Sequence, residues 1–401
     1  MSQESLTANE PRPELDSAAG WVVVGATFLA TFTVFGVAYS FGSFFGSMAD
    51  EFDGARSEVA LFFSITTFLY FALGVFTGRV ADRIGPRPVL LFGAVCLVLG
   101  LLITSRVQSL WVGYITYGLG VGIGVACAYV PMVATVGLWF EKRRSAAMGV
   151  AVAGIGVGTL VVAPLSERLI DTYGWRQTYV IMAVGSAVLL AIAAVGARRP
   201  AATVGATAVR PLMEVIKTSR TFALLYASIA FLAFSLFIPF VFLDDYLDEK
   251  NIDGSAALLV GAIGLSSVLG RLGLGALAAI LTPLRLYQGS FLVVSLSYLQ
   301  WLFLGSSYPA LLLFSVVLGV AYGGFIALAP AVAADFFGPV GLGGVLGALY
   351  TAAGVGGLIG PPVAGVLIDR FGYPTTLIVA FGLGFAAFLC LLPLDSSQSP
   401  D

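Results

Sequence analysis

Twelve long apolar runs are the feature that most constrains how this chain can fold. Each is about 20 residues long, and about 20 residues of α-helix cross the ~30 Å hydrocarbon layer of a bilayer. The runs therefore predict an all-α integral membrane protein with twelve transmembrane helices. They lie near residues 21–46, 58–77, 89–105, 109–135, 145–166, 177–197, 221–243, 256–278, 286–305, 308–334, 343–368 and 374–394.

The charge and cysteine content argues against several other classes of protein. Only 10% of the residues are charged and 59% are hydrophobic, whereas a soluble domain carries about 25% charged residues. The net charge of −2 gives no reason to expect nucleic acid as a partner. There is no histidine, and the three cysteines lie far apart inside apolar runs. We therefore expect no metal, no cofactor and no enzyme active site.

One polar connection divides the runs into two sets of six. It spans Arg198–Arg220 and is the longest connection between runs. The N-terminal tail has no basic segment before a short apolar core, so we do not expect a cleavable signal peptide. The expected organisation is a cytoplasmic tail at 1–20, six-helix bundles at 21–197 and 221–394, a cytoplasmic linker at 198–220 and a cytoplasmic tail at 395–401.

An internal repeat relates the two sets of six runs. The segment PLSERLIDTYG (Pro164–Gly174) recurs as PVAGVLIDRFG (Pro362–Gly372), 198 positions later. A repeat in the same orientation predicts two bundles related by a pseudo-two-fold axis along the membrane normal. Such bundles have a cavity between them and can rock around a central site.

Lysine and arginine predict that both termini face the cytoplasm. With that orientation, 13 of the 20 basic residues lie in cytoplasmic segments and six lie in outer loops. The outer stretch Asp244–Asp253 holds five acids against one lysine, and we expect a solvated loop face there. The expected location is the cell membrane, with membrane lipid as a contact.

The loop after the second run carries a motif, GRVADRIGPRP, at Gly78–Pro88. It resembles the pattern G-x-x-x-D-R-x-G-x-[RK] of the major facilitator superfamily, whose members fold as two six-helix bundles. In that superfamily the motif acts as a cytoplasmic latch for the outward-facing state. The resemblance implies the latch residues Gly78, Asp82, Arg83, Gly85 and Arg87.

Three further segments resemble the monocarboxylate transporter branch of that superfamily, in its prokaryotic type. They are DSAAGW (Asp16–Trp21), WFEKRRSAAMG (Trp139–Gly149) and YGWRQTYV (Tyr173–Val180). In that branch an acid precedes Gly-Trp at the first span, an aromatic–F–x–K–R–R segment precedes the fifth, and G-W-R opens the sixth. The resemblance covers nearly the whole chain.

The run Ala256–Ala278 contains one full charge, Arg271, about 15 residues from its outer end. A charge at mid-span costs roughly 2.5–3.5 kcal/mol on insertion scales, and such residues usually serve a function. Ser267, Gly264 and Gly275 share its helix face and are small or polar, which predicts a cavity or a tight helix contact there. A guanidinium can bind a carboxylate through two parallel hydrogen bonds. The alternative is an arginine that only reaches back to the inner interface.

The resemblance assigns the substrate carboxylate to Arg271 and departs from the family at three places. The aspartate that animal-type carriers have one turn earlier is Ser267 here, and their first-span lysine is Tyr39. The second cation that oxalate–formate antiporters carry in the eleventh span has no equivalent in the run 343–368. One positive charge favours one carboxylate. The substrate-binding residues implied are Arg271, Ser267, Tyr322, Phe325, Tyr129 and Tyr39.

We expect a secondary active transporter of small monocarboxylates, such as lactate or pyruvate, that works as a monomer by alternating access. A proton is the expected coupled ion. Because no acid lies at mid-span, the proton would travel with the substrate–arginine pair, or the carrier would exchange anions instead. The alternatives are an oxalate/formate-like or other organic-anion exchanger and, outside transport, a membrane receptor or scaffold on a carrier fold.

Overall fold

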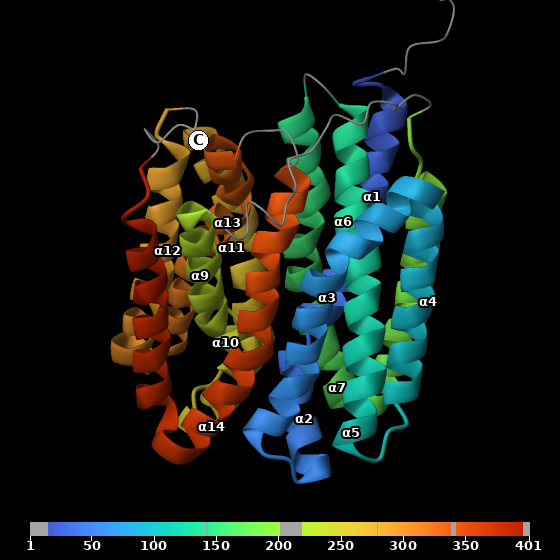
Figure 1. Ribbon diagram of the computed structural model, residues 1–401. Coiled ribbons are helices and arrows are strands. Elements are labelled where there is room, and N and C mark those ends of the chain that lie inside the picture. The colour runs from blue at the N-terminus through green and yellow to red at the C-terminus, as the bar shows by residue number, and fades with distance from the viewer. Residues whose placement is uncertain (1–14, 141–142, 201–218, 279, 338–341, 396–401) are drawn as a thin grey trace, which may run out of the picture.

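The computed structural model describes residues 15–140, 143–200, 219–278, 280–337 and 342–395. All regular secondary structure in these ranges is helical (Figure 1). In chain order the elements are α1 (Ala18–Tyr39), α2 (Gly42–Phe52), α3 (Arg56–Ile84), α4 (Pro86–Thr104), α5 (Leu110–Gly113), the π-helical segment η2 (Tyr114–Leu119), α6 (Gly120–Trp139), α7 (Arg144–Gly196), α9 (Arg220–Leu236), α10 (Ile238–Lys250), α11 (Ala256–Leu277), α12 (Pro283–Leu304), α13 (Tyr308–Phe337) and α14 (Leu342–Leu391).

These helices account for the twelve predicted crossings. Within the described ranges, nine helical stretches are long and apolar enough to cross a membrane. Two of them, Ala147–Gly196 and Gly344–Leu391, contain two crossings each, because the backbone turns at Gly174 in α7 and at Gly372 in α14. The helix α12 adds the remaining crossing. The prediction of an all-α protein with twelve transmembrane helices is confirmed.

The two turns occupy equivalent places in the chain. Gly174 has a φ of 77° and Gly372 a φ of 76°, a backbone region that glycine adopts freely and other residues avoid. They are the last residues of the two repeated segments, 198 positions apart. The repeat in the sequence is therefore also a repeat of backbone conformation.

Two helix pairs make the most extensive contacts between the N-terminal and C-terminal parts of the molecule. We call α1 to α7 the first half and α9 to α14 the second half; in Figure 1 they lie side by side, blue to green and yellow-green to red. The helix α3 packs against α14, and α7 packs against α11. Within the halves, α1 packs against α7 and α9 against α14. The contacts between the halves thus run along α3 and α7 on one side and α14 and α11 on the other.

Helix backbones approach closely where glycine faces a neighbouring helix. A Cβ atom on Gly323 of α13 would lie 2.1 Å from the carbonyl oxygen of Ser267 in α11. Small residues permit this close packing in membrane helices, where van der Waals contact drives association. The contact fixes α11, the helix that carries Arg271, against α13.

Large apolar side chains cover the outside of the bundle. Val22, Phe92, Ile115 and Leu269 are each more than 60% exposed. Proteins in water rarely expose contiguous apolar surface of this kind. The surface is suited to lipid, as expected of a multi-pass membrane protein.

Candidate functional site

Arg271 lies between the halves and is almost fully enclosed. Arg271 is 7% exposed, and no other charged residue in the described part of the chain is buried as deeply. The Nη1 atom donates a hydrogen bond of 3.0 Å to the carbonyl oxygen of Val152 in α7. The arginine of the second half is thereby linked to the backbone of the first half.

The other edge of the guanidinium has no partner. Both Nε and Nη2 are buried and make no hydrogen bond. A buried donor without an acceptor loses about 1–3 kcal/mol, and more when it is charged. The Nε and Nη2 hydrogens point the same way and match the two oxygens of a carboxylate. The geometry therefore suits an anionic group on this edge of Arg271.

Three tyrosines from both halves form a hydroxyl chain that ends beside Arg271. The ring of Tyr322 in α13 lies 5.9 Å from Arg271 Cζ, within reach of a cation–π interaction. The Tyr322 hydroxyl is 3.2 Å from that of Tyr39 in α1, and the Tyr39 hydroxyl is 3.5 Å from that of Tyr70 in α3. These hydroxyl contacts bring the predicted site residues Tyr39 and Tyr322 together and add Tyr70, which was not predicted.

Two further tyrosines lie close enough to Arg271 to interact with it electrostatically. They are Tyr129 in α6, which the sequence predicted, and Tyr350 in α14, which it did not. Tyr129 also contacts the edge of the Phe35 ring, at 5.2 Å between ring centres. The signal for Tyr70 and Tyr350 in the sequence is a polar-tipped aromatic residue inside an apolar run. That signal is shared by every buried tyrosine, so it does not single them out.

The two remaining predicted site residues, Phe325 and Ser267, make different kinds of contact. The Phe325 ring is 6.5 Å from that of Tyr350 and 5.6 Å from that of Phe291, and it lines a small cavity together with Tyr322. It is therefore an apolar neighbour of the site. The Ser267 hydroxyl instead donates to the carbonyl oxygen of Gly264, at 2.7 Å. This hydrogen bond lies within α11.

The expected latch residues lie at the end of α3 and the start of α4. Gly78 faces Val130 of α6. Gly85 has a φ of 95° and lets the chain turn between the helices. Arg83 and Arg87 are exposed. The side chain of Asp82 lies outside the described part of the structure, so the latch stays a prediction.

Within the described residues, no group of three or more histidine, cysteine, aspartate or glutamate side chains could hold a metal ion. The described cysteines are all free thiols. The chemistry available around Arg271 is therefore hydrogen bonding, charge and aromatic contact.

Comparison with known proteins points to one group of membrane transporters. The family model described as Major Facilitator Superfamily matches residues 27–307 and 254–401. Monocarboxylate transporter 13 of Rattus norvegicus is 30% identical over 390 residues, covering 94% of this chain and 90% of the relative. Monocarboxylate transporter 3 of Rattus norvegicus is 30% identical over 370 residues, covering 88% of this chain and 75% of the relative. The agnestins efflux protein AgnL12 of Paecilomyces divaricatus is 29% identical, covering 93% and 86%.

A solved structure shares the fold. It is that of a bacterial homolog to the human lysosomal transporter Spinster, in an inward-facing and unoccupied conformation. The TM-score is 0.71 at 16% sequence identity, and the match covers 94% of this chain and 95% of the other. At that identity the likeness concerns the fold alone.

Proposed function

This chain belongs to the major facilitator superfamily, among the monocarboxylate transporters, and from that premise we propose that it carries small monocarboxylates, lactate- or pyruvate-like, by alternating access. It is a multi-pass membrane transporter and not an enzyme. We further propose that it works as a monomer in the cell membrane with both termini in the cytoplasm. The proposed site is the space between the halves beside Arg271.

One observation carries the proposal: the paired Nε and Nη2 donors of Arg271 are buried without an acceptor. A substrate carboxylate would supply both acceptors at once and neutralise the charge. The low dielectric around the pair strengthens the attraction. Because Nη1 already holds Val152, the substrate would add to this link between the halves and not replace it.

The charge of the site favours a monoanion. Among the described residues, no second cation is buried near Arg271, so a second carboxylate would enter without a counter-charge. Burying an unpaired carboxylate costs several kcal/mol. The hydroxyls of Tyr39 and Tyr322 could bind a keto or hydroxyl oxygen, and Phe325 could contact an apolar end.

The proton is proposed to move with the substrate. None of the described carboxylates is as deeply buried as Arg271, and the half-buried Asp244, which lines a cavity with Tyr39, lies near the end of α10 and not beside the guanidinium. A protonated monocarboxylic acid is neutral and could leave Arg271 more readily than the anion.

The test is uptake of labelled lactate into proteoliposomes, with and without an inward proton gradient, by wild type, Arg271→Lys and Arg271→Ala. We expect Arg271→Ala to lose uptake roughly 30-fold or more, since removing one partner of a buried charge pair costs about 2–5 kcal/mol. Arg271→Lys keeps the charge without the fork, and we expect it to transport at an intermediate rate. Arg106→Lys, an exposed loop residue, is the matched control. Normal uptake by both Arg271 variants would refute the proposal.

Exchange of small organic anions, in the manner of an oxalate/formate exchanger, is the second candidate. No described carboxylate pairs with Arg271, which favours exchange because exchange needs no proton carrier. Uptake that requires preloaded anion and ignores the proton gradient would select exchange. Stronger competition by oxalate than by lactate would contradict the monoanion site.

A further inference from the structure

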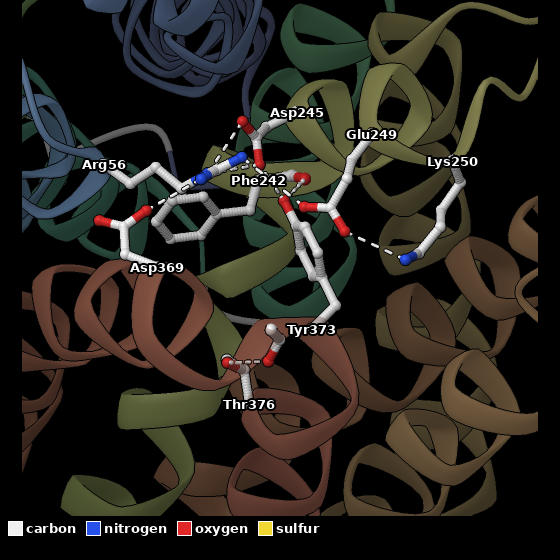
Figure 2. Close-up of polar contacts among 9 residues, drawn as sticks. Arg56, Phe242, Asp245, Glu249, Lys250, Asp369, Tyr373 and Thr376 are labelled. Atoms are coloured by element: carbon white, nitrogen blue, oxygen red, sulfur yellow. Dashed lines mark hydrogen bonds and ion pairs between the residues drawn. The ribbon is translucent and has the colours of Figure 1, made fainter.

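The end of the bundle opposite the start of α1 and the end of α14 carries a charge network that joins the two halves (Figure 2). Arg56, the first residue of α3, is the cation at its centre. The Nε atom donates to both carboxylate oxygens of Asp245, at 3.0 and 2.9 Å. Its Nη1 atom donates to Asp369, at 2.9 Å, and its Nη2 atom lies 3.6 Å from Glu249. Arg56 belongs to the first half and all three acids belong to the second.

The second half holds its acids in place for this contact. The hydroxyl of Tyr373 donates to Asp245 and to the carbonyl oxygen of Phe242 (Figure 2). Lys250 pairs with Glu249 at 3.0 Å. Contacts within the second half therefore orient Asp245 and Glu249. The Asp245 side chain is only 18% exposed, so the expectation of a solvated loop face is wrong for Asp245.

A second polar contact joins the halves at the same end. Ser255 caps the start of α11 and donates its hydroxyl to Glu167 of α7. This contact lies on a different pair of helices from the Arg56 network. At this end, polar contacts between the halves therefore join α3 to α10 and α14, and α7 to α11.

Beneath the charges, aromatic rings from the two halves meet. Tyr39 lies 4.7 Å from Phe240 between ring centres, and Phe45 lies 5.3 Å from Phe242. A Cβ atom on Gly42 would lie 2.6 Å from the carbonyl oxygen of Phe240, so the backbones also approach closely. Between these layers is a cavity lined by Tyr39 and Asp244, among others, with room for about one water molecule.

We propose that Arg56 is the lock of a gate at this end: its contacts with Asp245, Asp369 and Glu249 hold the halves together here and break when the central site opens to this side. The proposal rests on the alternating access of the proposed function, whose orientation makes this the outer gate. It concerns a different end of the molecule from the latch residues in the loop between α3 and α4.

The physical basis is that these interactions exist in one state only. When the halves part, Arg56 and its acids separate and each becomes hydrated. A contact made in one conformation shifts the equilibrium toward that conformation by its own free energy. Without Arg56, the three carboxylates of the second half would lose their counter-charge on the first half, so loss of this one residue should favour the open state.

The same end offers a matched control. Arg176 of α7 pairs with Glu51 of α2 at 2.6 Å, and both residues belong to the first half. The two arginines are similarly exposed, with 30% and 34% of their side chains accessible. Breaking the Arg176 pair removes an ion pair without affecting the contact between halves.

The experiment measures the separation of the halves directly. Spin labels are placed at Gln108→Cys and Ser306→Cys, exposed loop positions of the two halves at this end, in full-length protein whose native cysteines are replaced by alanine. Double electron–electron resonance in lipid nanodiscs then compares wild type with Arg56→Gln, Asp245→Asn and Arg176→Gln. We expect a longer-distance population to grow in the first two variants, to a lesser extent in Arg56→Lys, and to stay at the wild-type level in Arg176→Gln.

Two results would overturn the proposal. One is an unchanged distance distribution in both Arg56→Gln and Asp245→Asn, each of which must first give a monodisperse protein. The other is an equal shift in Arg176→Gln, which would mean that any lost surface ion pair loosens this end. The readout contains no substrate, so a failed carboxylate assay does not affect it, and a failed gate does not affect the substrate proposal.

Discussion

Arg271 has two different hydrogen-bonding environments on one side chain. Its Nη1 edge holds the Val152 carbonyl, while Nε and Nη2 remain without a partner. The hydrogen bond of Nη1 holds the guanidinium in one orientation, so Nε and Nη2 point in a fixed direction. A fixed direction reduces the ordering cost of binding a planar anion.

The tyrosine hydroxyls beside this edge give the first prediction. Tyr322→Phe removes the hydroxyl that contacts Tyr39 but keeps the ring over Arg271. Because one net hydrogen bond is worth about 0.5–1.5 kcal/mol, we expect the KM for lactate to rise about 2- to 12-fold. Uptake kinetics in proteoliposomes check this.

Tyr298→Phe provides the control. Tyr298 is also fully buried, but its hydroxyl donates to the carbonyl oxygen of Ser235 within the second half. We expect an unchanged KM with a small loss of thermal stability. Equal effects of the two variants on KM would show that the Tyr322 hydroxyl has only a packing role.

At the scale of residues, the sequence singled out Arg271 more clearly than the side chains that surround it. Arg271 stands out because a charge inside an apolar run is rare. Tyr70 and Tyr350 were missed because nothing local distinguishes a tyrosine that faces a site from one that faces a neighbouring helix. Ser267 is expected at the site from its helix face and from its place one turn before Arg271, and the structure shows its hydroxyl donating to the carbonyl oxygen of Gly264.

At the scale of helices, the position of Arg271 depends on the close packing of α11 on α13. Gly323 allows the backbone of α13 to lie against Ser267, one turn before Arg271. A larger side chain would push the two helices apart and move the guanidinium away from Tyr322.

The second prediction tests this contact. We expect Gly323→Val to lower the free energy of unfolding by about 1–3 kcal/mol, the usual cost of overpacking, and to reduce uptake. Gly382→Ala is the control, since a Cβ atom there would meet nothing within 4 Å. Thermal unfolding in detergent measures both variants, and equal Tm values would contradict the packing argument.

Hydropathy predicted the apolar middle of the helices but not their ends. The helix α10 continues to Lys250, seven residues past the end predicted at 243, and stops at Asn251, which has a φ of 52°. Asparagine tolerates this left-handed conformation and commonly ends helices. Because helices extend beyond the hydrocarbon layer, charged turns such as this one look like loops in the sequence.

At the scale of the molecule, α1 begins and α14 ends at one end of the bundle, and α3 begins, with Arg56, at the other (Figure 1). The start of the described chain is tied to that end by a hydrogen bond from the Asp16 amide to the carbonyl oxygen of Trp139, at 2.9 Å. The basic residues assigned to the cytoplasm outnumber those assigned to the outside, 13 to six.

The third prediction concerns this orientation. We expect green fluorescent protein fused after Asp401 to fluoresce in a bacterial host, and alkaline phosphatase fused there to stay inactive, because the former folds in the cytoplasm and the latter outside it. The reverse pattern would place the Arg56 gate on the cytoplasmic side. Fusions at Ser306 should give the opposite result to those at Asp401.

The repeat allowed the two-fold organisation to be predicted, since both copies end in a turn glycine. The closed state at the Arg56 end could not be predicted. It depends on Arg56 meeting residues 189 and 313 positions away, and no local pattern records which distant surfaces touch in a given state.

Arg271 also sets the charge that the proposed site carries across the membrane. A monoanion bound without a proton would change that charge from one positive to none, whereas a monoanion bound with a proton would leave it unchanged. A membrane potential of 100 mV does about 2.3 kcal/mol of work on an elementary charge that crosses the whole field. The voltage across the membrane should therefore act on the empty site alone when the anion travels without a proton, and on the empty and the loaded site alike when a proton accompanies it.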